Sequence, residues 1–452
     1  MKKKDIIDLK VTDMIFPSKG VGVAEGKKVI VKGGLEGQTI RTRIKKNRKD
    51  KAEGMLLEVV ERADYEVDSF CPHFGRCGGC ARQTVPYEKQ LEMKGGMIQK
   101  LLADHGVTGY EWGGVLASPV IYDYRNKMEF SFGDEFKDGP TELGMHKKGR
   151  HYDVVTVDQC KISGPDFNAI LKATHDHFVE RGIRHFDFMR GTKGFLRNLN
   201  IRQGKKTGEI LVGLSTSSIE DHDLQPWIDA LLRLELQGEI VGILQIVNDM
   251  TANVVEGDYK ILYGRDWYME KLYDLSFKVS FYSFFQTNPI AAELLYDTAM
   301  DYMDHIEDRN VFDLFSGTGT IAQIMARKAS HVTAIEIVED AVKAAKENAA
   351  MNGIDNCDFL AGDVFKVLEN VTVKPDVIVV DPPRAGITPK ALDKILSYGV
   401  KGITYISCGP RALAENLAQC QEAGYEVKRV VCVDMFPHTP HVEVCTLLKK
   451  IK

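Results

Sequence analysis

The sequence lacks the features that mark secreted and membrane-spanning proteins. Met1-Lys2-Lys3-Lys4 is followed by aspartates rather than an apolar segment, and no later stretch approaches the ~20 apolar residues that cross a bilayer. The nine cysteines are an odd number in a chain without a secretory signal, which argues against a disulfide framework and favours metal or catalytic roles. We therefore expect a cytoplasmic protein.

The sequence also has no internal repeat, no low-complexity segment and no excess of positive charge. Its formal net charge is -5, so any RNA or DNA site must come from local basic patches. The 452 residues are enough for several domains, and the shares of apolar and charged residues are those of an ordinary soluble protein.

Residues 1–63 contain short β-like runs separated by glycine turns, which predicts a small closed barrel. Between the last two runs lies a basic cluster, Lys45–Lys51, in a hairpin position. This cluster is either a solvated turn or a surface that contacts the phosphate backbone of RNA. Together with Gly20–Ala24, the basic hairpin resembles the TRAM domain, an OB-like RNA-binding barrel.

Cys71, Cys77 and Cys80 lie close together and are separated by glycines that let backbone approach a bound centre. Thiolates held this near each other usually share a metal. Cys160 is the only other cysteine before residue 357 and is the expected fourth ligand, while His73 is a competing ligand for zinc. The spacing does not decide between zinc and an iron–sulfur cluster.

Residues 64–274 are expected to form a central α+β domain in which this metal centre links separate segments of the chain. The spacing of apolar residues predicts a helix over residues 87–104, which could pack on the C-terminal domain. Three β-like stretches mix cationic residues with aromatic or other apolar ones, which suits phosphate contacts and base stacking but also a polar sheet face. These stretches are residues 124–132, 143–151 and 196–202.

From about residue 275, strands alternate with helices, which predicts a doubly wound parallel sheet with a late antiparallel strand. Strands are expected at residues 311–315, 331–337, 358–361, 376–380, 403–407, 427–433 and 442–449, with helices between the first six. The first strand runs into a glycine turn, residues 315–320, that lets backbone approach a nucleotide-like ligand.

Two cofactors suit this turn. Ala322 completes a G-x-G-x-x-A pattern, and Glu336 ends the second strand where a carboxylate can accept ribose hydroxyls, so a dinucleotide is one candidate. S-adenosylmethionine is favoured instead, because Asp313 and the small residues after Gly319 suit a zwitterionic methionine end. Asp363, after the third strand, could then take the adenine amino group.

Two further strand ends carry reactive groups to the same edge. Asp381-Pro382-Pro383-Arg384 places a carboxylate on a proline-stiffened turn, a pattern typical of methyltransferases that act on planar nitrogen-containing substrates. Cys408 stands between a buried strand and a helix, so we expect its thiol to face a ligand. An isolated cysteine at a strand end is also common as a small buried hydrophobe.

With these groups on one edge, the chain resembles the RNA uracil-5-methyltransferase family over nearly its whole length. Besides the cysteine pattern, the resemblance is carried by Tyr124-Arg125-Asn126-Lys127, residues 283–289, residues 313–319, Asp381-Pro382-Pro383-Arg384, Ser407-Cys408-Gly409-Pro410 and residues 436–443. The cysteine pattern is similar to that of the branch with a [4Fe–4S] cluster, whose members modify 23S ribosomal RNA, whereas tRNA-modifying relatives commonly lack both cluster and barrel. The chain departs from the family at two positions: the family often has Asn where this chain has Gly409, and His where this chain has Asn198.

The resemblance implies a division of roles. Cys408 adds to C6 of uracil so that C5 can take a methyl group, and Glu443 then removes the C5 proton, with His441 and His438 as rival bases. The implied cluster ligands are Cys71, Cys77, Cys80 and Cys160. The implied cofactor contacts are Gln286, Phe315, Thr320, Glu336, Asp363 and Asp381.

The expected protein is multidomain, with an OB-like barrel (1–63), a central α+β domain with a [4Fe–4S] cluster (64–274) and a Rossmann-like class I methyltransferase domain (275–452). Its expected function is S-adenosylmethionine-dependent methylation of uridine C5 in 23S ribosomal RNA, as a monomer without a membrane partner. A tRNA uracil-5-methyltransferase, a nicotinamide-dependent oxidoreductase with an iron–sulfur centre and a non-catalytic RNA-binding assembly factor remain as alternatives. The presence of both Cys408 and Glu443 argues against the last.

Overall fold

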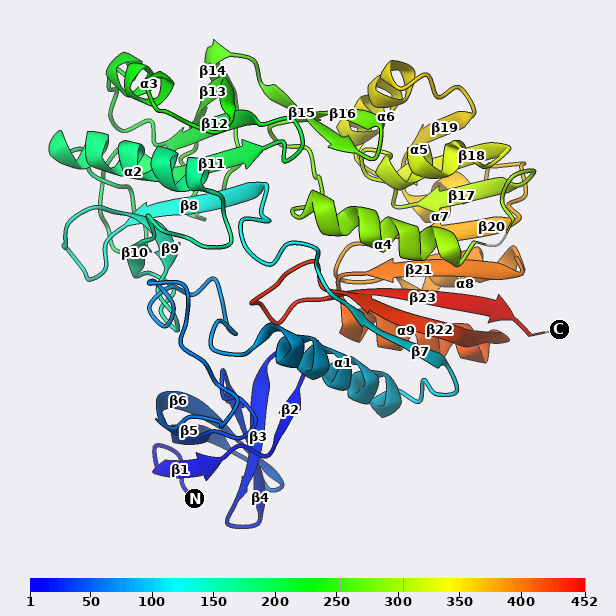
Figure 1. The fold of residues 1–452 in the computed structure, drawn as a ribbon, viewed down its shortest axis with the longest axis horizontal. Helices are drawn as coiled ribbons and strands as arrows, with labels where there is room; N and C mark the ends of the chain where they lie inside the picture. Colours follow the sequence, from blue (N-terminus) through cyan, green and yellow to red (C-terminus); the bar gives the residue numbers. More distant parts are fainter. Residues whose placement is uncertain (253, 304, 452) are drawn as a thin grey trace.

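The computed structural model describes residues 1–252, 254–303 and 305–451. Within these residues the strands form sheets of six, seven, two and eight strands, which follow one another along the chain with one exception described below (Figure 1). None of the helices in these ranges is both long and apolar enough to pass through a bilayer.

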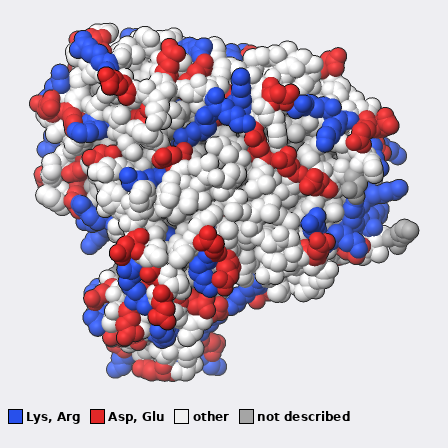
Figure 2. Space-filling model, viewed as in Figure 1, with Lys and Arg blue, Asp and Glu red and all other residues white. Residues whose placement is uncertain are grey.

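The N-terminal sheet has the strand order β1-β5-β6-β4-β3-β2. Its alternating apolar side chains meet in a small core that includes Leu9, Val29 and Ile40. The predicted basic cluster spans the β5–β6 hairpin, where Lys46 pairs with Glu53 at 3.5 Å. Figure 2 shows Lys and Arg of this sheet interspersed with Asp and Glu on the face in view. The strands are β1 (Ile6–Lys10), β2 (Asp13–Ile15), β3 (Lys19–Ala24), β4 (Lys27–Lys32), β5 (Thr39–Asn47) and β6 (Lys51–Glu61).

The middle sheet has the order β10-β9-β8-β11-β12-β13-β14, and α2 (Pro165–Glu180) and α3 (Gln225–Leu232) pack against its core through Phe167 and Trp227. Its strands are β8 (Lys127–Gly133), β9 (Glu142–His146), β10 (Val154–Thr156), β11 (Leu196–Gln203), β12 (Glu209–Thr216), β13 (Glu239–Val247) and β14 (Tyr259–Gly264).

Strand β11 corrects one expectation about RNA contacts. All of its residues are buried, and Arg197 donates to the carbonyls of Asn248 and Ala252 at 2.9 and 2.8 Å. Arg202 donates to the carbonyl of Ser283 at 2.7 Å. These two guanidinium groups therefore satisfy backbone acceptors inside the protein, so the phosphate-contact interpretation of residues 196–202 is wrong for them.

The two-stranded sheet, β15 (Trp267–Leu272) and β16 (Leu275–Ser280), connects the middle sheet to the C-terminal one (Figure 1). One hydrophobic cluster runs through all three parts, from Leu244 of the middle sheet through Phe277 to Leu295. The middle and C-terminal parts thus share a continuous core.

The C-terminal sheet has the order β19-β18-β17-β20-β21-β23-β22-β7. Strands β17 to β21 pair in parallel, and β23 is antiparallel to both β21 and β22, which confirms the doubly wound sheet with a late antiparallel strand. Its strands are β17 (Asn310–Leu314), β18 (His331–Glu336), β19 (Cys357–Ala361), β20 (Val377–Val380), β21 (Gly402–Ser407), β22 (Tyr425–Val433) and β23 (Glu443–Lys450).

Helices cover both faces of this sheet. On one face α4 (Pro289–Asp301), α5 (Thr320–Ala326) and α6 (Glu339–Met351) bury their apolar sides in one cluster. On the other face α7 (Val364–Leu368), α8 (Pro389–Ser397) and α9 (Pro410–Glu422) form a second cluster together with α1 (Tyr87–Asp104). Helix α1 has the residue range that the sequence predicted.

Strand β7 (Glu111–Leu116) is the exception to the chain order, because it forms the last strand of the C-terminal sheet and pairs in parallel with β22. The sequence pattern did not indicate this strand, and residues 64–274 were expected to form the central domain. The expectation that the helix over residues 87–104 could pack on the C-terminal domain agrees with the structure. The Gly113-Gly114 pair of β7 has the composition of a turn, which hides the strand in the sequence. In the structure, an added Cβ at Gly113 would lie 2.3 Å from the side chain of Val431. A glycine is therefore needed where this strand approaches β22.

Candidate active site

The ends of neighbouring strands bring three reactive side chains to one edge of the C-terminal sheet. Asp381 follows β20 and Cys408 follows β21, its parallel neighbour. Glu443 is the first residue of β23, and the pairing of Val444 with Ser407 places it beside Cys408. The sequence predicted these residues on one sheet edge, and the pairing of β20, β21 and β23 brings them together there.

The glycine loop between β17 and α5 crosses the same edge. Phe315, Gly317 and Gly319 have φ angles of 68°, 54° and 73°, a left-handed conformation that is unusual for a residue with a side chain such as Phe315. An added Cβ at Gly319 would lie 2.5 Å from the ring of Phe359. The amide of Gly317 donates to the carboxylate of Glu336 at 2.9 Å, which ties the loop to the end of β18.

Most of the predicted cofactor residues surround this loop because β19, β18, β17 and β20 are consecutive in the sheet. They are Phe315 after β17, Thr320 at the start of α5, Glu336 at the end of β18, Asp363 after β19 and Asp381 after β20. Such a row of loops at the C-terminal ends of parallel strands is where open α/β sheets bind ligands.

Gln286, the remaining predicted cofactor residue, lies in a different part of the chain, the segment before α4. Its carbonyl accepts a hydrogen bond from Asn126 Nδ2 at 2.9 Å. Two residues later, Asn288 Nδ2 donates to the carbonyl of Met435 at 3.1 Å. This segment is therefore bound both to the middle domain and to the connection that leads into β23.

The protonation of the site is governed by burial and by the closeness of its acids. Burial raises the pKa of Glu443 to about 8, with the charge of Asp381 adding to the effect and Arg384 opposing it. Desolvation likewise raises the pKa of Asp381 to about 7 and that of Asp313 to about 8. Carboxyl groups with pKa values near neutrality can accept and return protons at physiological pH.

The thiol of Cys408 is affected in the same direction. Burial raises its pKa to about 11, Glu443 and Asp381 contribute further, and the guanidinium of Arg384 opposes them. The free protein therefore holds a neutral thiol beside carboxyl groups that can exchange protons. Such a pairing of a nucleophile with acid–base groups supports covalent catalysis on a bound electrophile.

The two histidines named as rival bases have different surroundings. His441 Nδ1 lies 3.3 Å from Arg384 Nη2, and burial lowers its pKa to about 4, with Arg384 contributing. The ring of His438 is 3.1 Å from Gln90 Nε2 and stacks on Tyr122 with a centroid distance of 4.7 Å. The contacts of His438 are thus with α1 and the middle domain rather than with Cys408.

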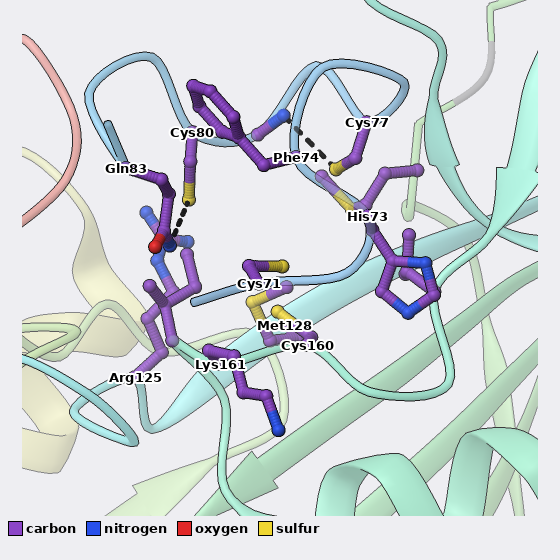
Figure 3. Close-up of a pocket in the computed structure, with 14 residues that line it drawn as sticks. Cys71, His73, Phe74, Cys77, Cys80, Gln83, Arg125, Met128, Cys160 and Lys161 are labelled. Carbon is purple, nitrogen blue, oxygen red and sulfur yellow. Dashed lines mark hydrogen bonds between the residues drawn. The ribbon is translucent and has the colours of Figure 1, made fainter. Parts of the chain in front are cut away.

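The four cysteines from the two separate segments line one cavity of about 110 Å³, and Figure 3 shows their sulfurs around this space. The amide of Gly79 donates to Cys77 Sγ at 3.3 Å and Gln83 Nε2 donates to Cys80 Sγ at 3.7 Å. The backbone of Cys160 is held by two hydrogen bonds with the side chain of Asn168. The lining cysteines are Cys71, Cys77, Cys80 and Cys160.

Within the described ranges, no three His, Cys, Asp or Glu side chains converge closely enough to hold a metal ion in the present arrangement. His73 also lines the cavity, but its Nε2 accepts from the amide of Gln159 at 3.1 Å and lies 3.3 Å from Asp158. Burial raises the pKa of Cys77 to about 11 and that of Cys80 to about 12. These thiols would release protons on binding a cation.

The sequence analysis missed a buried polar network between α1 and residues 434–438. Gln90 and Lys94 lie on the buried side of α1 together with Met93 and Met97. Their spacing of four residues puts both on one face of the helix. Polar residues inside an otherwise apolar helical stripe were the signal that could have revealed this network.

Comparison with known proteins shows that the chain is similar to RNA methyltransferases. Residues 249–451 match the family model described as tRNA (Uracil-5-)-methyltransferase. An uncharacterized RNA methyltransferase of Clostridium tetani is 44% identical, with 100% of this chain and 99% of that protein covered, and one of Caldanaerobacter subterraneus is 43% identical, with 100% of both covered.

A similar solved structure is that of the Pyrococcus abyssi tRNA (uracil-54, C5)-methyltransferase in complex with S-adenosyl-L-homocysteine. It is 25% identical, covers 98% of this chain and 100% of its own, and superposes with a TM-score of 0.77. The likeness therefore extends over nearly the whole length of the chain.

Proposed function

The chain belongs to the RNA uracil-5-methyltransferase family, and on that basis we propose that it methylates C5 of a specific uridine in 23S ribosomal RNA through a covalent bond between Cys408 and C6. The observation that carries the proposal is the meeting of Cys408, Glu443 and Asp381 at the edge where the glycine loop lies. The methyl donor is S-adenosylmethionine, in keeping with the family.

The reaction divides into two halves. In the first, the partly exposed thiol of Cys408 gives its proton to solvent and its sulfur forms a bond to C6, which moves the electron pair of the C5–C6 double bond towards C5 and the O4 carbonyl. C5 then attacks the methyl carbon of the sulfonium, and S-adenosylhomocysteine is the leaving group. In the second, Glu443 accepts the proton of C5, the double bond re-forms, and the bond between C6 and sulfur breaks.

The cofactor edge suits S-adenosylmethionine better than a dinucleotide. Glu336 and Asp363, and Asp381 when it is ionised, give this edge negative charges that attract an ammonium and a sulfonium and would repel a pyrophosphate. We assign the cofactor contacts to Gln286, Phe315, Thr320, Glu336, Asp363 and Asp381.

We also propose a [4Fe–4S] cluster on Cys71, Cys77, Cys80 and Cys160. A single zinc ion needs four ligands about 2.3 Å from one point, so its sulfurs lie within ~4 Å of one another. The described cysteines line a cavity of about 110 Å³ without converging on a single metal ion, and the choice of a cluster over zinc follows from the similarity of their spacing to the cluster-containing branch of the family. N–H groups that donate to Cys77 and Cys80 are typical of cysteines that act as thiolate ligands. When bound, the cluster would supply a cross-link between distant segments rather than methyl-transfer chemistry.

RNA recognition is assigned to the N-terminal part. We propose that residues 1–63 form a TRAM-like OB barrel whose β5–β6 hairpin contacts phosphates. Residues 64–86 and 117–274 would then form the cluster domain, and residues 275–452, together with α1 and β7 (87–116), the methyltransferase domain. The enzyme is expected to act as a cytoplasmic monomer. A tRNA substrate is the second candidate, because the similar Pyrococcus abyssi protein is by its name a tRNA methyltransferase.

The test is to map 5-methyluridine in ribosomal and transfer RNA from a strain that lacks this gene and from the same strain carrying a plasmid copy. Loss of the modification at a 23S position, with recovery on complementation, is the expected result. Loss in transfer RNA alone would select the tRNA alternative. Unchanged 5-methyluridine in both RNA classes would reject the proposed activity.

A further inference from the structure

The connection between β22 and β23, residues 434–442, is largely buried although it contains no regular secondary structure. Asp434 and Met435 are 0% exposed and His438 is 3% exposed. Buried irregular backbone is stable only where other groups satisfy its N–H and C=O groups. Two of its partners, Lys94 and Gln90, come from a helix more than 300 residues away in sequence.

Lys94 of α1 binds the start of the connection. Its ammonium lies 2.6 Å from the carboxylate of Asp434, and both side chains are fully shielded from water. The same ammonium donates to the carbonyl of Phe436 at 3.0 Å. Because a buried charge without its partner is costly, this pair strongly restrains the position of Asp434.

Gln90, one turn earlier on α1, binds the middle of the connection. Its Oε1 accepts from the amide of His438 at 2.9 Å, and its Nε2 lies 3.1 Å from His438 Nδ1. The carbonyl of His438 accepts from the amides of both Ala81 and Arg82, each at 3.0 Å. His438 is thus held by α1 and by the residues that directly follow Cys80.

Cys408 and Glu443 depend on this connection to different degrees. Cys408 stands between β21 and α9, whose positions are fixed by the core of the sheet. Glu443 is the first residue after the connection and pairs with Val433 at the very end of the β22–β23 ladder, so a shift of residues 434–442 acts on Glu443 before it reaches any residue of β21.

We propose that Gln90 and Lys94 are positioning residues that hold Glu443 at the correct distance from the Cys408 adduct, and that the contacts of Ala81 and Arg82 with His438 extend this restraint to the cysteine loop. This inference rests on the proposed function, because it assigns Gln90 and Lys94 to the second half of the reaction. Weakening the restraint slows removal of the C5 proton and leaves addition and methyl transfer unchanged. The methylated covalent intermediate then accumulates.

The test uses the full-length enzyme, a substrate RNA and methyl-labelled S-adenosylmethionine in rapid-quench experiments. Two variants loosen the connection at different points: Gln90→Leu, and the double variant Lys94→Met with Asp434→Asn, which removes both charges so that neither is left buried and unpaired. Lys89→Met is the matched control, since Lys89 pairs with Glu92 on the partly exposed side of the same helix. Glu443→Gln and unmodified enzyme are run in parallel.

In Gln90→Leu and in the double variant we expect the first-turnover rate of methyl transfer to stay within about twofold, while release of RNA slows by about 10- to 100-fold, the effect of misplacing a catalytic group by up to ~1 Å. A labelled protein–RNA complex that survives denaturing gels should therefore appear in both variants and not in Lys89→Met. Unimpaired methyl transfer in the first turnover also reports that each variant is folded.

Equal slowing of methyl transfer and release would overturn the inference, because it would indicate a general loss of structure. Normal release in both variants would overturn it as well. If Glu443→Gln itself traps no labelled complex, Glu443 is not the base that removes the C5 proton, and the proposed function is wrong on that point. If Glu443→Gln traps the complex and the α1 variants do not, the mechanism stands and only the positioning role is wrong.

Discussion

Ser407 pairs with Val444 across β21 and β23, and this register places Cys408 and Glu443 side by side at the edge of the sheet. The closeness has an electrostatic cost, because a negative charge on Glu443 raises the pKa of the Cys408 thiol. The two groups are suited to act in sequence, since each is easier to ionise while the other is neutral.

Replacing Cys408 by Ala tests the first half of the reaction. We expect this variant to bind RNA and cofactor with affinities close to those of the unmodified enzyme but to transfer no methyl group, because C5 becomes nucleophilic only after addition at C6. Filter binding, calorimetry with S-adenosylhomocysteine and methyl incorporation measure the three quantities. Residual methyl transfer above the uncatalysed level would show that Cys408 is not the nucleophile.

Replacing Glu443 by Gln tests the second half. The variant should add its thiol and accept label from the methyl donor, but retain the C5 proton, so that a protein–RNA complex persists on denaturing gels. The complex should disappear in the Cys408→Ala, Glu443→Gln double variant. Normal turnover of Glu443→Gln would exclude Glu443 as the base and make His441 the next residue to replace.

The raised pKa of Glu443 predicts a pH-dependent effect on stability. The pKa rises from an ordinary 4.5 to about 8 in the folded protein, so folding favours the protonated form. The stabilisation from that proton is complete below about pH 4.5 and is lost as the pH rises through about 8. Because glutamine stays neutral, the Tm advantage of Glu443→Gln over the unmodified protein should grow between about pH 5 and about pH 9. Glu415→Gln, on the exposed face of α9, is the control; a Tm difference for Glu443→Gln that does not change with pH would contradict this account.

The cysteine cavity predicts a coloured protein. Enzyme purified without oxygen should be brown, absorb near ~400 nm, and contain iron and sulfide rather than zinc. The Cys77→Ser variant should lose solubility or RNA affinity before it loses methyl-transfer chemistry, because the cluster would link residues 71–80 to Cys160. Stoichiometric zinc without sulfide would reject the cluster, and normal folding and activity of Cys77→Ser would reject its structural role.

The β5–β6 hairpin predicts salt-dependent RNA binding by a protein with a net charge of -5. Changing Lys45, Lys46, Arg48 and Lys49 to Gln should weaken RNA binding and reduce the slope of log affinity against log salt concentration, with no effect on S-adenosylmethionine affinity. The same measurement on Lys28→Gln and Lys32→Gln, at exposed positions of strand β4, separates a local from a general charge effect. An unchanged slope in the hairpin variant would assign these residues to solvent.

The sequence predicted those parts of the fold whose signals are local. The apolar spacing of α1 repeats within a few residues, and the strands that precede Asp381 and Cys408 are short apolar runs that end in turns. Because parallel strands in a doubly wound sheet share a C-terminal edge, these local signals were enough to gather the site residues.

What the sequence could not predict depends on contacts between distant residues. The burial of Arg197 and Arg202 follows from acceptors in other segments, and no pattern within β11 distinguishes a buried arginine from one that binds phosphate. The pair of Lys94 and Asp434 joins residues 340 positions apart. Periodicity and spacing describe neighbours along the chain and carry no information on such pairs.

The position of β7 has a consequence for the synthesis of the protein. Among the strands of the eight-stranded sheet it leaves the ribosome first, yet its partner β22 lies near the other end of the chain. At 5–20 residues per second, the ribosome needs about 15 to 60 s to make the roughly 300 residues between them. During that interval the entire middle sheet is made while β7 still lacks its partner. The methyltransferase sheet can therefore be completed only at the end of translation, and a nascent chain that stalls before β22 exposes an unpaired strand edge for chaperones to cover.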